Sequence, residues 1–358
     1  MRNYKIAVLP GDGIGIDVTK EAIKVLRAVA AVDGEINFEL EEFPWGTQYY
    51  LETGVMMPKE ALNALSSFDS ILLGAVGDPS VPDHITLWGM LLPIRQRFQQ
   101  YVNLRPVRLL PGIDGPLRYK GTEDINMIFV RENTEGEYSG VGGRVHVGTP
   151  IEVASQTAVF TRQGTERIMR YAFEIARQRE RKHLTSVTKS NACNYSMVFW
   201  DEIFKEVSQE FKDIATGQYL VDAMAAFLVT HPERFSVVVA SNLFGDILTD
   251  LGSAIMGSIG LSASANLDPT HKYPSMFEPI HGSAPDIKGK GIANPLGAVW
   301  AAMMLLEHHG ENSLANLVMK AIEDQVAERN IRTPDLGGCS TTWEVGDDLE
   351  QRIRMMAK

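Results

Sequence analysis

The chain has 358 residues, enough for two domains, and its 44% hydrophobic and 22% charged residues suit a large buried core. A formal net charge of −11 without any basic run argues against a nucleic acid as partner. No apolar run reaches membrane-spanning length, and the start MRNYKIAVLPG reads as a strand rather than a signal peptide, so we expect a cytoplasmic protein that does not bind membranes.

Short apolar runs alternate with helix-like segments along the chain, which predicts an α/β protein. The run YKIAVL predicts the first strand, and residues 17–30 predict an amphipathic helix. Further strands are predicted at SILLGA, INMIFV and SVVVA, and another amphipathic helix at 312–328. Glycine and proline at 111–116 and 260–295 indicate loops.

The segment GDGIG follows the first strand and precedes the first helix, as a Rossmann fingerprint would. The full motif G-x-G-x-x-G requires glycine at position 16, where the chain has Ile16, and no clear acidic strand end follows about 20 residues later. We therefore expect Gly11, Gly13 and Gly15 to shape a tight turn instead.

Three arginines adjoin apolar runs near the middle of the chain. Arg95 and Arg105 flank the segment PIRQRFQQYVNLRP, and Arg131 directly follows INMIFV. Arginine holds a carboxylate through two parallel hydrogen bonds. Each arginine alone could be an ordinary surface cation, but together they suggest a clamp for a dicarboxylate.

Two aspartates in SNLFGDILTDLG, Asp246 and Asp250, have the spacing that places both carboxylates on one face of a helix. The opposite face carries the apolar residues Ile247, Leu248, Leu251 and Ile255. Carboxylates without a nearby Cys or His favour Mg²⁺ or Mn²⁺ over zinc, so with Asp222 the pair forms a candidate metal site. The alternative is an acidic helix start that complements the helix dipole.

Seven segments in unbroken order resemble the metal-dependent β-decarboxylating dehydrogenases, the family that includes the isocitrate and 3-isopropylmalate dehydrogenases. These segments are LPGDGIG, LLPIRQRFQQYVNLRP, FVRENTEGEYSG, TKSNACNYS, VDAMAAFLV, SNLFGDILTDLG and FEPIHGSAPDIKGKGIANP. LWGMLL, before Arg95, most resembles the members that act on tartrate and D-malate.

The resemblance implies a two-domain α/β fold with an active-site cleft between the domains, and not a Rossmann fold. Residues 1–100 plus 256–358 would form a large cofactor-binding domain. Residues 101–255 would form an inserted small domain with the interface of a homodimer. Lys189 and Asp222 would reach across that interface into the partner's site.

The resemblance also implies a reaction, in which NAD oxidises a 2-hydroxydiacid and the β-carboxylate leaves as CO₂. The three arginines would hold the substrate carboxylates, and the three aspartates would bind Mn²⁺ or Mg²⁺. Lys189 would take the proton of the substrate hydroxyl, and Tyr138 would protonate the enol carbon. A monovalent cation such as K⁺ is a further candidate cofactor.

The loop HGSAPDI is implied to wrap the adenosine of NAD, with the GDGIG turn nearby. Asp286 would bond the ribose hydroxyls, and its charge would repel the 2′-phosphate of NADP. The other implied cofactor contacts are Asn191, Glu278, His281, Gly282, Ser283, Ala284 and Asn294.

Trp88, in the segment TLWGM, bears on the size of the substrate. Family members for 3-isopropylmalate have an acidic residue in this place, and those for isocitrate have small polar residues nearby. Because an indole fills the space of a larger C3 substituent, we expect a four-carbon diacid, D-malate or tartrate. Three alternatives stay open, namely a 3-isopropylmalate dehydrogenase, a non-catalytic regulatory subunit, and a Rossmann-type dehydrogenase whose activity would survive EDTA.

Overall fold

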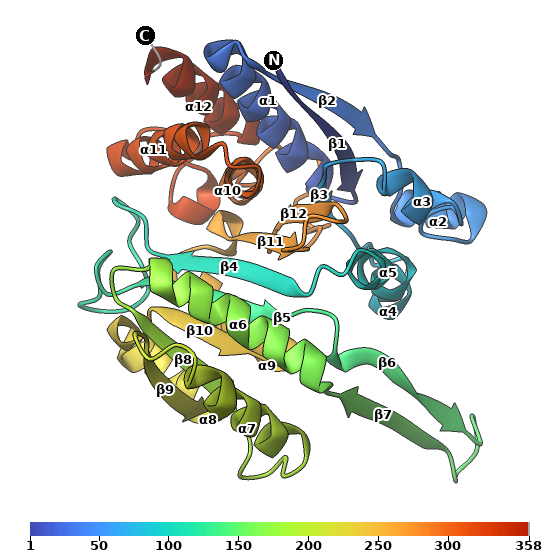
Figure 1. Ribbon diagram of the computed structural model, residues 1–358. Helices are drawn as coiled ribbons and strands as arrows, with labels where there is room; N and C mark the ends of the chain where they lie inside the picture. Colours follow the sequence, from blue (N-terminus) through green and yellow to red (C-terminus); the bar gives the residue numbers. More distant parts are fainter. Residues whose placement is uncertain (357–358) are drawn as a thin grey trace.

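The computed structural model describes residues 1–356 and arranges them as two lobes joined by one sheet (Figure 1). In the described residues the sheet has ten strands, in the spatial order β2 (Ile36–Glu42), β1 (Arg2–Gly11), β3 (Ser70–Ala75), β12 (Ser275–Pro279), β11 (Ala263–Leu267), β4 (Val102–Arg108), β5 (Asn126–Glu132), β10 (Val237–Ala240), β8 (His183–Thr188) and β9 (Ala215–Leu220). β11 is antiparallel to both neighbours and β4 is antiparallel to β5. The other neighbouring strands are parallel, so the α/β class is confirmed.

In the first lobe, helices cover both faces of the sheet around β1 and β3. On one face, α1 (Gly15–Asp33) and α10 (Leu296–His308) pack against the strands, and α11 (Asn312–Glu328) and α12 (Thr342–Met356) pack on these helices. The other face packs against α2 (Thr47–Thr53), α3 (Ala61–Leu65), the π-helical turn η1 (Leu87–Leu91) and α5 (Leu92–Arg97), and α4 (Asp83–Thr86) lies against η1. Successive β1 residues point to opposite faces, which is why Ile6 and Val8 join one apolar cluster and Ala7 and Leu9 the other.

The second lobe surrounds β5, β8, β9 and β10. Its helices are α6 (Arg162–Gln178), α7 (Ser196–Ser208), α8 (Val221–Thr230) and α9 (Asn242–Ile255). A hairpin of β6 (Gly136–Val145) and β7 (Val153–Val159) projects from this lobe as an arm (Figure 1). Short 3₁₀ turns complete the chain, η2 (Pro232–Arg234), η3 (Ile259–Leu261) and η4 (Pro334–Leu336).

Most predicted elements are present. The helices expected at 17–30 and 312–328 are α1 and α11, and the expected strands are β1, β3, β5 and β10. The loop expected at 260–295 is wrong in part, because β11 and β12 lie within it. Both strands are short and sit in the middle of the sheet, where pairing on two sides stabilises sequences of low strand propensity.

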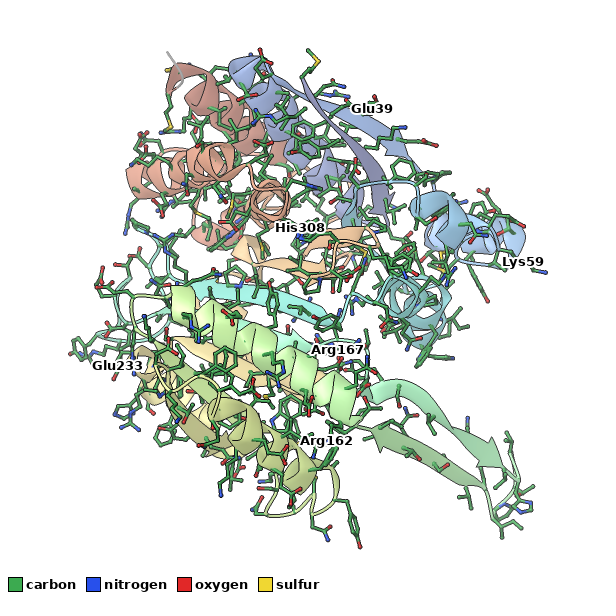
Figure 2. The ribbon with its side chains drawn as sticks, in the orientation of Figure 1. Glu39, Lys59, Arg162, Arg167, Glu233 and His308 are labelled. Carbon is green, nitrogen blue, oxygen red and sulfur yellow. The ribbon has the colours of Figure 1, made fainter. Side chains whose placement is uncertain are left out.

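One residue of the predicted apolar face of α9 is not in the core. Leu248 and Ile255 are buried as expected, but Ile247 is 57% exposed. His308, labelled in Figure 2, is a partly buried polar side chain at the end of α10 that packs against Phe277 of β12.

The proposed inserted domain, 101–255, begins just before β4 and ends with α9, and this division remains a prediction. Within residues 1–356, no helix combines the length and the apolar composition required to cross a bilayer.

Candidate active site

The centre of the site is an ion pair between β5 and α9. Arg131, 1% exposed on β5, contacts Asp246 through Nη1 and donates to Asn242 Oδ1 from Nε at 3.0 Å and Nη2 at 2.7 Å. Gly245 allows this approach, because a Cβ there would lie 2.8 Å from the Cβ of Arg131.

The other two predicted clamp arginines lie around this pair. Arg105, on β4, donates to Thr249 Oγ1 at 2.6 Å and lies 3.6 Å from Asp246 and 4.0 Å from Asp250. Arg95, on α5, pairs with Glu278 at 2.7 Å. The Nε atoms of Arg95 and Arg105 are buried without a hydrogen-bond partner in the described part of the chain.

Burial and charge act against each other on these groups. Burial, followed by repulsion from Arg131, lowers the pKa of Arg105 to about 10. Burial alone would raise the pKa of Asp246, but the neighbouring Arg131 and Arg105 lower it below the ordinary value. Burial raises the pKa of Asp250, and the opposing charges of Arg105 and Arg131 do not offset this effect. The two carboxylates of α9 therefore differ, and a bound cation would stabilise the charge of both.

Tyr138 joins this cluster from the base of the arm. Its hydroxyl donates to Asp246 Oδ2 at 3.2 Å, and its ring centroid lies 5.7 Å from the guanidinium carbon of Arg131. Burial and the charge of Asp246 raise the pKa of Tyr138, so the phenol remains protonated at neutral pH and can donate a proton.

Lys189 and Asp222 form a separate pair. Lys189 follows β8, Asp222 lies in the first turn of α8, and Nζ of Lys189 is 2.6 Å from Asp222 Oδ1. This hydrogen bond lowers the pKa of Asp222. Within residues 1–356 of one chain, no three His, Cys, Asp or Glu side chains converge as metal ligands, so one chain does not unite Asp222 with Asp246 and Asp250. Asn191 is exposed, close to Lys189 in the chain.

The GDGIG turn and the HGSAPDI loop pack directly against each other. The backbone N–H of Ile14 donates to Ser283 O at 2.8 Å, and a Cβ at Gly13, where φ is +58°, would lie 2.0 Å from the same oxygen. His281 is buried, and its Nε2 has no partner among the described residues. Gly282 and Asp286 are exposed and Ala284 is partly exposed. These features fit a loop that receives a polar ligand.

Two predicted cofactor contacts are held inside the protein. Glu278 Oε1 accepts hydrogen bonds from Arg95 and from Asn266, both at 2.7 Å. Asn294 donates to Asp335 at 2.9 Å and accepts from the backbone N–H of Leu296 at 3.0 Å. If either side chain binds the cofactor, it would do so while keeping these internal hydrogen bonds.

Trp88 lies between the first lobe and the arm. It belongs to η1 and is 40% exposed, and a Cβ at Gly140 would lie 2.7 Å from its Cη2 atom. Gly140 is on the same strand as Tyr138, so the indole lies next to the strand that carries the predicted proton donor.

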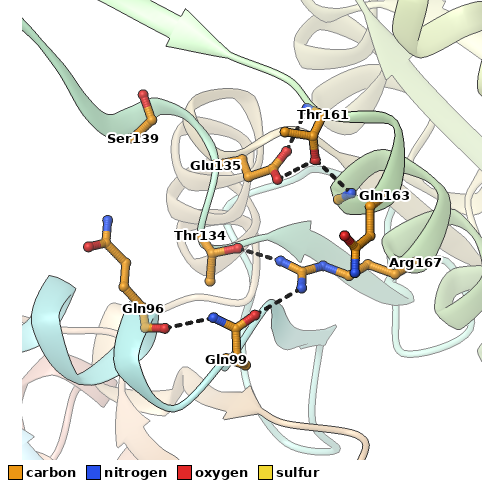
Figure 3. Close-up of a pocket in the computed structure, with 9 residues that line it drawn as sticks. Gln96, Gln99, Thr134, Glu135, Ser139, Thr161, Gln163 and Arg167 are labelled. Atoms are coloured by element: carbon orange, nitrogen blue, oxygen red, sulfur yellow. Dashed lines mark hydrogen bonds between the residues drawn. The ribbon is translucent and has the colours of Figure 1, made fainter.

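A polar cavity of about 450 Å³ lies next to this region (Figure 3). Its lining residues are Gln96, Gln99, Thr134, Glu135, Ser139, Thr161, Gln163, Gly164 and Arg167, and none of the predicted site residues is among them. Arg167 already bonds Thr134 at 2.8 Å and Gln99 at 3.2 Å. The lining has one cation, Arg167, and one carboxylate, Glu135, so this cavity suits a dicarboxylate less well than the cluster of three arginines does.

The sequence did not single out Asn242, Thr249 and Asn266. Asn242 and Thr249 lie four residues before and three after Asp246, so the helical spacing that relates Asp246 to Asp250 would have found both. Asn266 had no such signal, because its strand was expected to be a loop.

The comparisons with known proteins agree with this arrangement. Residues 5–349 match the family model described as isocitrate/isopropylmalate dehydrogenase. The chain is 51% identical to a protein named probable tartrate dehydrogenase/decarboxylase of Bacillus subtilis, over 99% of both chains. It is also 51% identical to the D-malate dehydrogenase [decarboxylating] of Escherichia coli, over 98% of both. The solved structure of isocitrate dehydrogenase from Methylococcus capsulatus superposes with a TM-score of 0.88 at 34% identity, covering 98% of this chain and 99% of that one.

Proposed function

This chain belongs to the isocitrate/isopropylmalate dehydrogenase family, and we propose that it oxidises D-malate or tartrate with NAD and Mn²⁺ or Mg²⁺. D-malate would yield pyruvate and CO₂. The observation that carries the proposal is the cluster of buried Arg95, Arg105 and Arg131 around Asp246. Full-length relatives named for tartrate and for D-malate support the substrate class.

The arginines suit a dicarboxylate because some of their donors remain unused. The Nε groups of Arg95 and Arg105 are buried without a partner in the described residues, and an unsatisfied buried donor costs about 1–3 kcal/mol. Arg95 bonds Glu278 through Nη2, which leaves its other terminal nitrogen for a carboxylate oxygen of the substrate. The low exposure of all three arginines also strengthens their attraction for an anion.

The carboxylates of α9 fit a hard divalent cation. Asp246 and Asp250 face the same arginine within 4.0 Å, and no Cys or His among the described residues joins them in a metal-binding group. The bound cation would polarise the substrate hydroxyl and stabilise negative charge on its oxygen. Asp222 would complete the ligand set from a second copy of the chain.

Two side chains would carry out the proton transfers. Lys189, as the neutral amine, would take the proton of the C2 hydroxyl, and its hydrogen bond to Asp222 holds the amino group in place. Tyr138 would donate a proton to the enol carbon after CO₂ leaves, a role that suits a phenol whose pKa is raised. NAD, when bound, would accept the hydride from C2.

The cofactor preference rests on Asp286. It is exposed on the loop that packs on the GDGIG turn, and the unpartnered Nε2 of His281 is a donor or acceptor available in the same loop. A carboxylate there favours the ribose hydroxyls of NAD over the 2′-phosphate of NADP.

A homodimer with shared sites explains the separation of Lys189 and Asp222 from the arginine cluster. The helices that carry the aspartates also expose apolar side chains, Val229 on α8 at 43% and Ile247 on α9 at 57%. Exposed apolar surface of this kind suits burial against a second copy.

An NADH-release assay of the purified protein tests the proposal. D-malate and the tartrate isomers should react faster than 3-isopropylmalate and isocitrate, and NAD should be preferred over NADP. Activity should require Mn²⁺ or Mg²⁺ and should be lost in EDTA. Faster turnover of 3-isopropylmalate would favour that dehydrogenase instead, activity in EDTA would favour a Rossmann-type enzyme, and no turnover of any acid would favour a regulatory subunit.

A further inference from the structure

A buried polar network lies directly beneath Arg95. Asn266, on β11 and 0% exposed, donates from Nδ2 to Glu278 Oε1 at 2.7 Å. The same oxygen accepts from Arg95 Nη2 at 2.7 Å. Asn266, Glu278 and Arg95 therefore form a continuous chain from amide to carboxylate to guanidinium.

The orientation of the Asn266 amide is fixed by its neighbours. Its Oδ1 accepts from Nδ2 of Asn103 on β4 and from Nδ2 of Asn133 after β5, both at 2.9 Å. Asn103 and Asn133 are themselves buried, at 0% and 1% exposed. Because two donors point at Oδ1, the NH₂ group of Asn266 must face Glu278.

We propose that Asn266 is a positioning residue that sets the substrate affinity of Arg95 through Glu278. This role of Asn266 rests on the proposed function of Arg95 as a substrate clamp. The donor from Asn266 shares the charge of Glu278 and fixes this carboxylate, so that Arg95 is held through Nη2 and its other terminal guanidinium nitrogen is left to bind the substrate. Without that donor, Glu278 can shift and neutralise Arg95 more completely.

The same succession of amide, carboxylate and guanidinium also occurs between α11 and α12, where no predicted site residue lies. Gln325, 1% exposed on α11, donates to Asp348 Oδ2 at 2.8 Å, and that oxygen accepts from Arg352 Nε at 2.6 Å. Asp348 and Arg352 belong to α12. This second amide, carboxylate and guanidinium lie on α11 and α12 and include no predicted site residue, so they provide a matched control.

The test compares Asn266→Asp with Gln325→Glu. Each change keeps the shape of a buried amide and replaces a donor with an acceptor beside a carboxylate. Binding of D-malate is measured by calorimetry with Mn²⁺ and without NAD, and KM and kcat are measured with NAD. Asn266→Asp should weaken binding and raise KM about tenfold or more, the usual effect of a lost hydrogen bond to a charged group, while kcat changes much less. Gln325→Glu should lower Tm and leave Kd and KM unchanged.

If Asn266→Asp does not fold, Asn266→Ser carries the test, because it removes the same donor without adding a charge. A folded Asn266 variant with the Kd and KM of the wild type overturns the inference and leaves the proposed function intact. A wild-type protein that neither binds nor oxidises D-malate or tartrate overturns the proposed function, and the inference with it.

Discussion

The charged side chains of the site have no net charge in the absence of ligands. Three arginines stand against the carboxylates of Glu278, Asp246 and Asp250, and ion pairs of 4.0 Å or less connect them. A divalent cation alone would add two positive charges to this cluster, and a dicarboxylate alone would add two negative charges. Because the two ligands neutralise each other, each should strengthen the binding of the other.

Asp246 is the residue on which this balance depends most. Asp246→Asn removes one negative charge that faces Arg131 and Arg105, and it weakens a predicted cation ligand. We expect the Kd for Mn²⁺, measured by calorimetry in the presence of D-malate, to rise at least about tenfold, since losing a charged partner of a buried group costs upwards of 1.4 kcal/mol.

Asp324→Asn is the control for this change. Asp324 pairs with Lys320 at 2.6 Å on α11, away from the arginine cluster. The Asp324→Asn protein should bind Mn²⁺ with the affinity of the wild type. Unaltered Mn²⁺ affinity of the Asp246→Asn protein would refute the metal assignment.

At the scale of elements, α9 lies close to β5 because position 245 has no side chain. In Gly245→Ala the new Cβ would lie 2.7 Å from Cγ of Arg131. The helix would gain about 1 kcal/mol of propensity, but overpacking costs about 1–3 kcal/mol. We therefore expect a net loss of about 1 kcal/mol in the free energy of unfolding, measured in urea, and a raised KM for the diacid, because Arg131 must move.

Gly143→Ala in the arm is the matched change, since a Cβ there meets nothing within 4 Å. This variant should keep both the stability and the KM of the wild type. A Gly245→Ala protein that is more stable than the wild type, with unchanged KM, would show that helix propensity outweighs the contact with Arg131.

The predicted elements are helices that bury one face and short apolar strands. Periodicity identified α1, α9 and α11, whereas β1, β3, β5 and β10 were identified from apolar runs, and β3 and β10 are buried on both faces. The arm could not be predicted in this way, because β6 is rich in glycine and exposes both faces. Ile247 was misplaced for a related reason, since periodicity identifies an apolar face but not whether the chain itself or another molecule covers it. The charged site residues were predicted from the order of the motifs. Asn242, Thr249 and Asn266 were not, because they act through contacts that only the fold creates.

At the scale of the whole molecule, acid should destabilise the first lobe through His308. Burial, together with the charges of the nearby His271 and His309 and against the opposing charge of Asp268, lowers the pKa of His308 to about 3. The unfolded chain would bind the proton with a pKa near 6.5. Between these values the unfolded state holds more protons, so stability falls as the pH falls below about 6.5.

His308→Gln should flatten this dependence. Between pH 7 and pH 5, the free energy of unfolding of the wild type should drop by about 2 kcal/mol more than that of His308→Gln, from about 1.4 kcal/mol per pKa unit. Urea unfolding at both pH values measures the difference. His84→Gln, at an exposed position, should leave the pH dependence as it is. Equal slopes for the wild type and His308→Gln would rule out this histidine as the cause.

If the site is divided between two copies of the chain, as proposed, two inactive variants should restore each other's activity in a mixed dimer. Lys189→Met and Asp246→Asn should each give a nearly inactive homodimer. In a mixed dimer, the first chain supplies an intact Asp246 and the second supplies an intact Lys189, so one of the two sites is complete. Random mixing during co-expression should therefore restore about one quarter of the wild-type activity, since half of the dimers are mixed and each has one working site.

The control mixes Lys189→Met with Asp222→Asn, whose changes fall in the same half of the site. Lys189 and Asp222 contact each other within one chain, so every site in a mixed dimer of this kind carries one defect, and no activity should return. Differently tagged chains, purified through both tags, establish that mixed dimers are present. Activity in both mixtures, or in neither, would contradict shared sites. Rescue in the first mixture alone would require that Lys189 serve the Asp246 of its partner, because no single chain in that mixture has both residues intact.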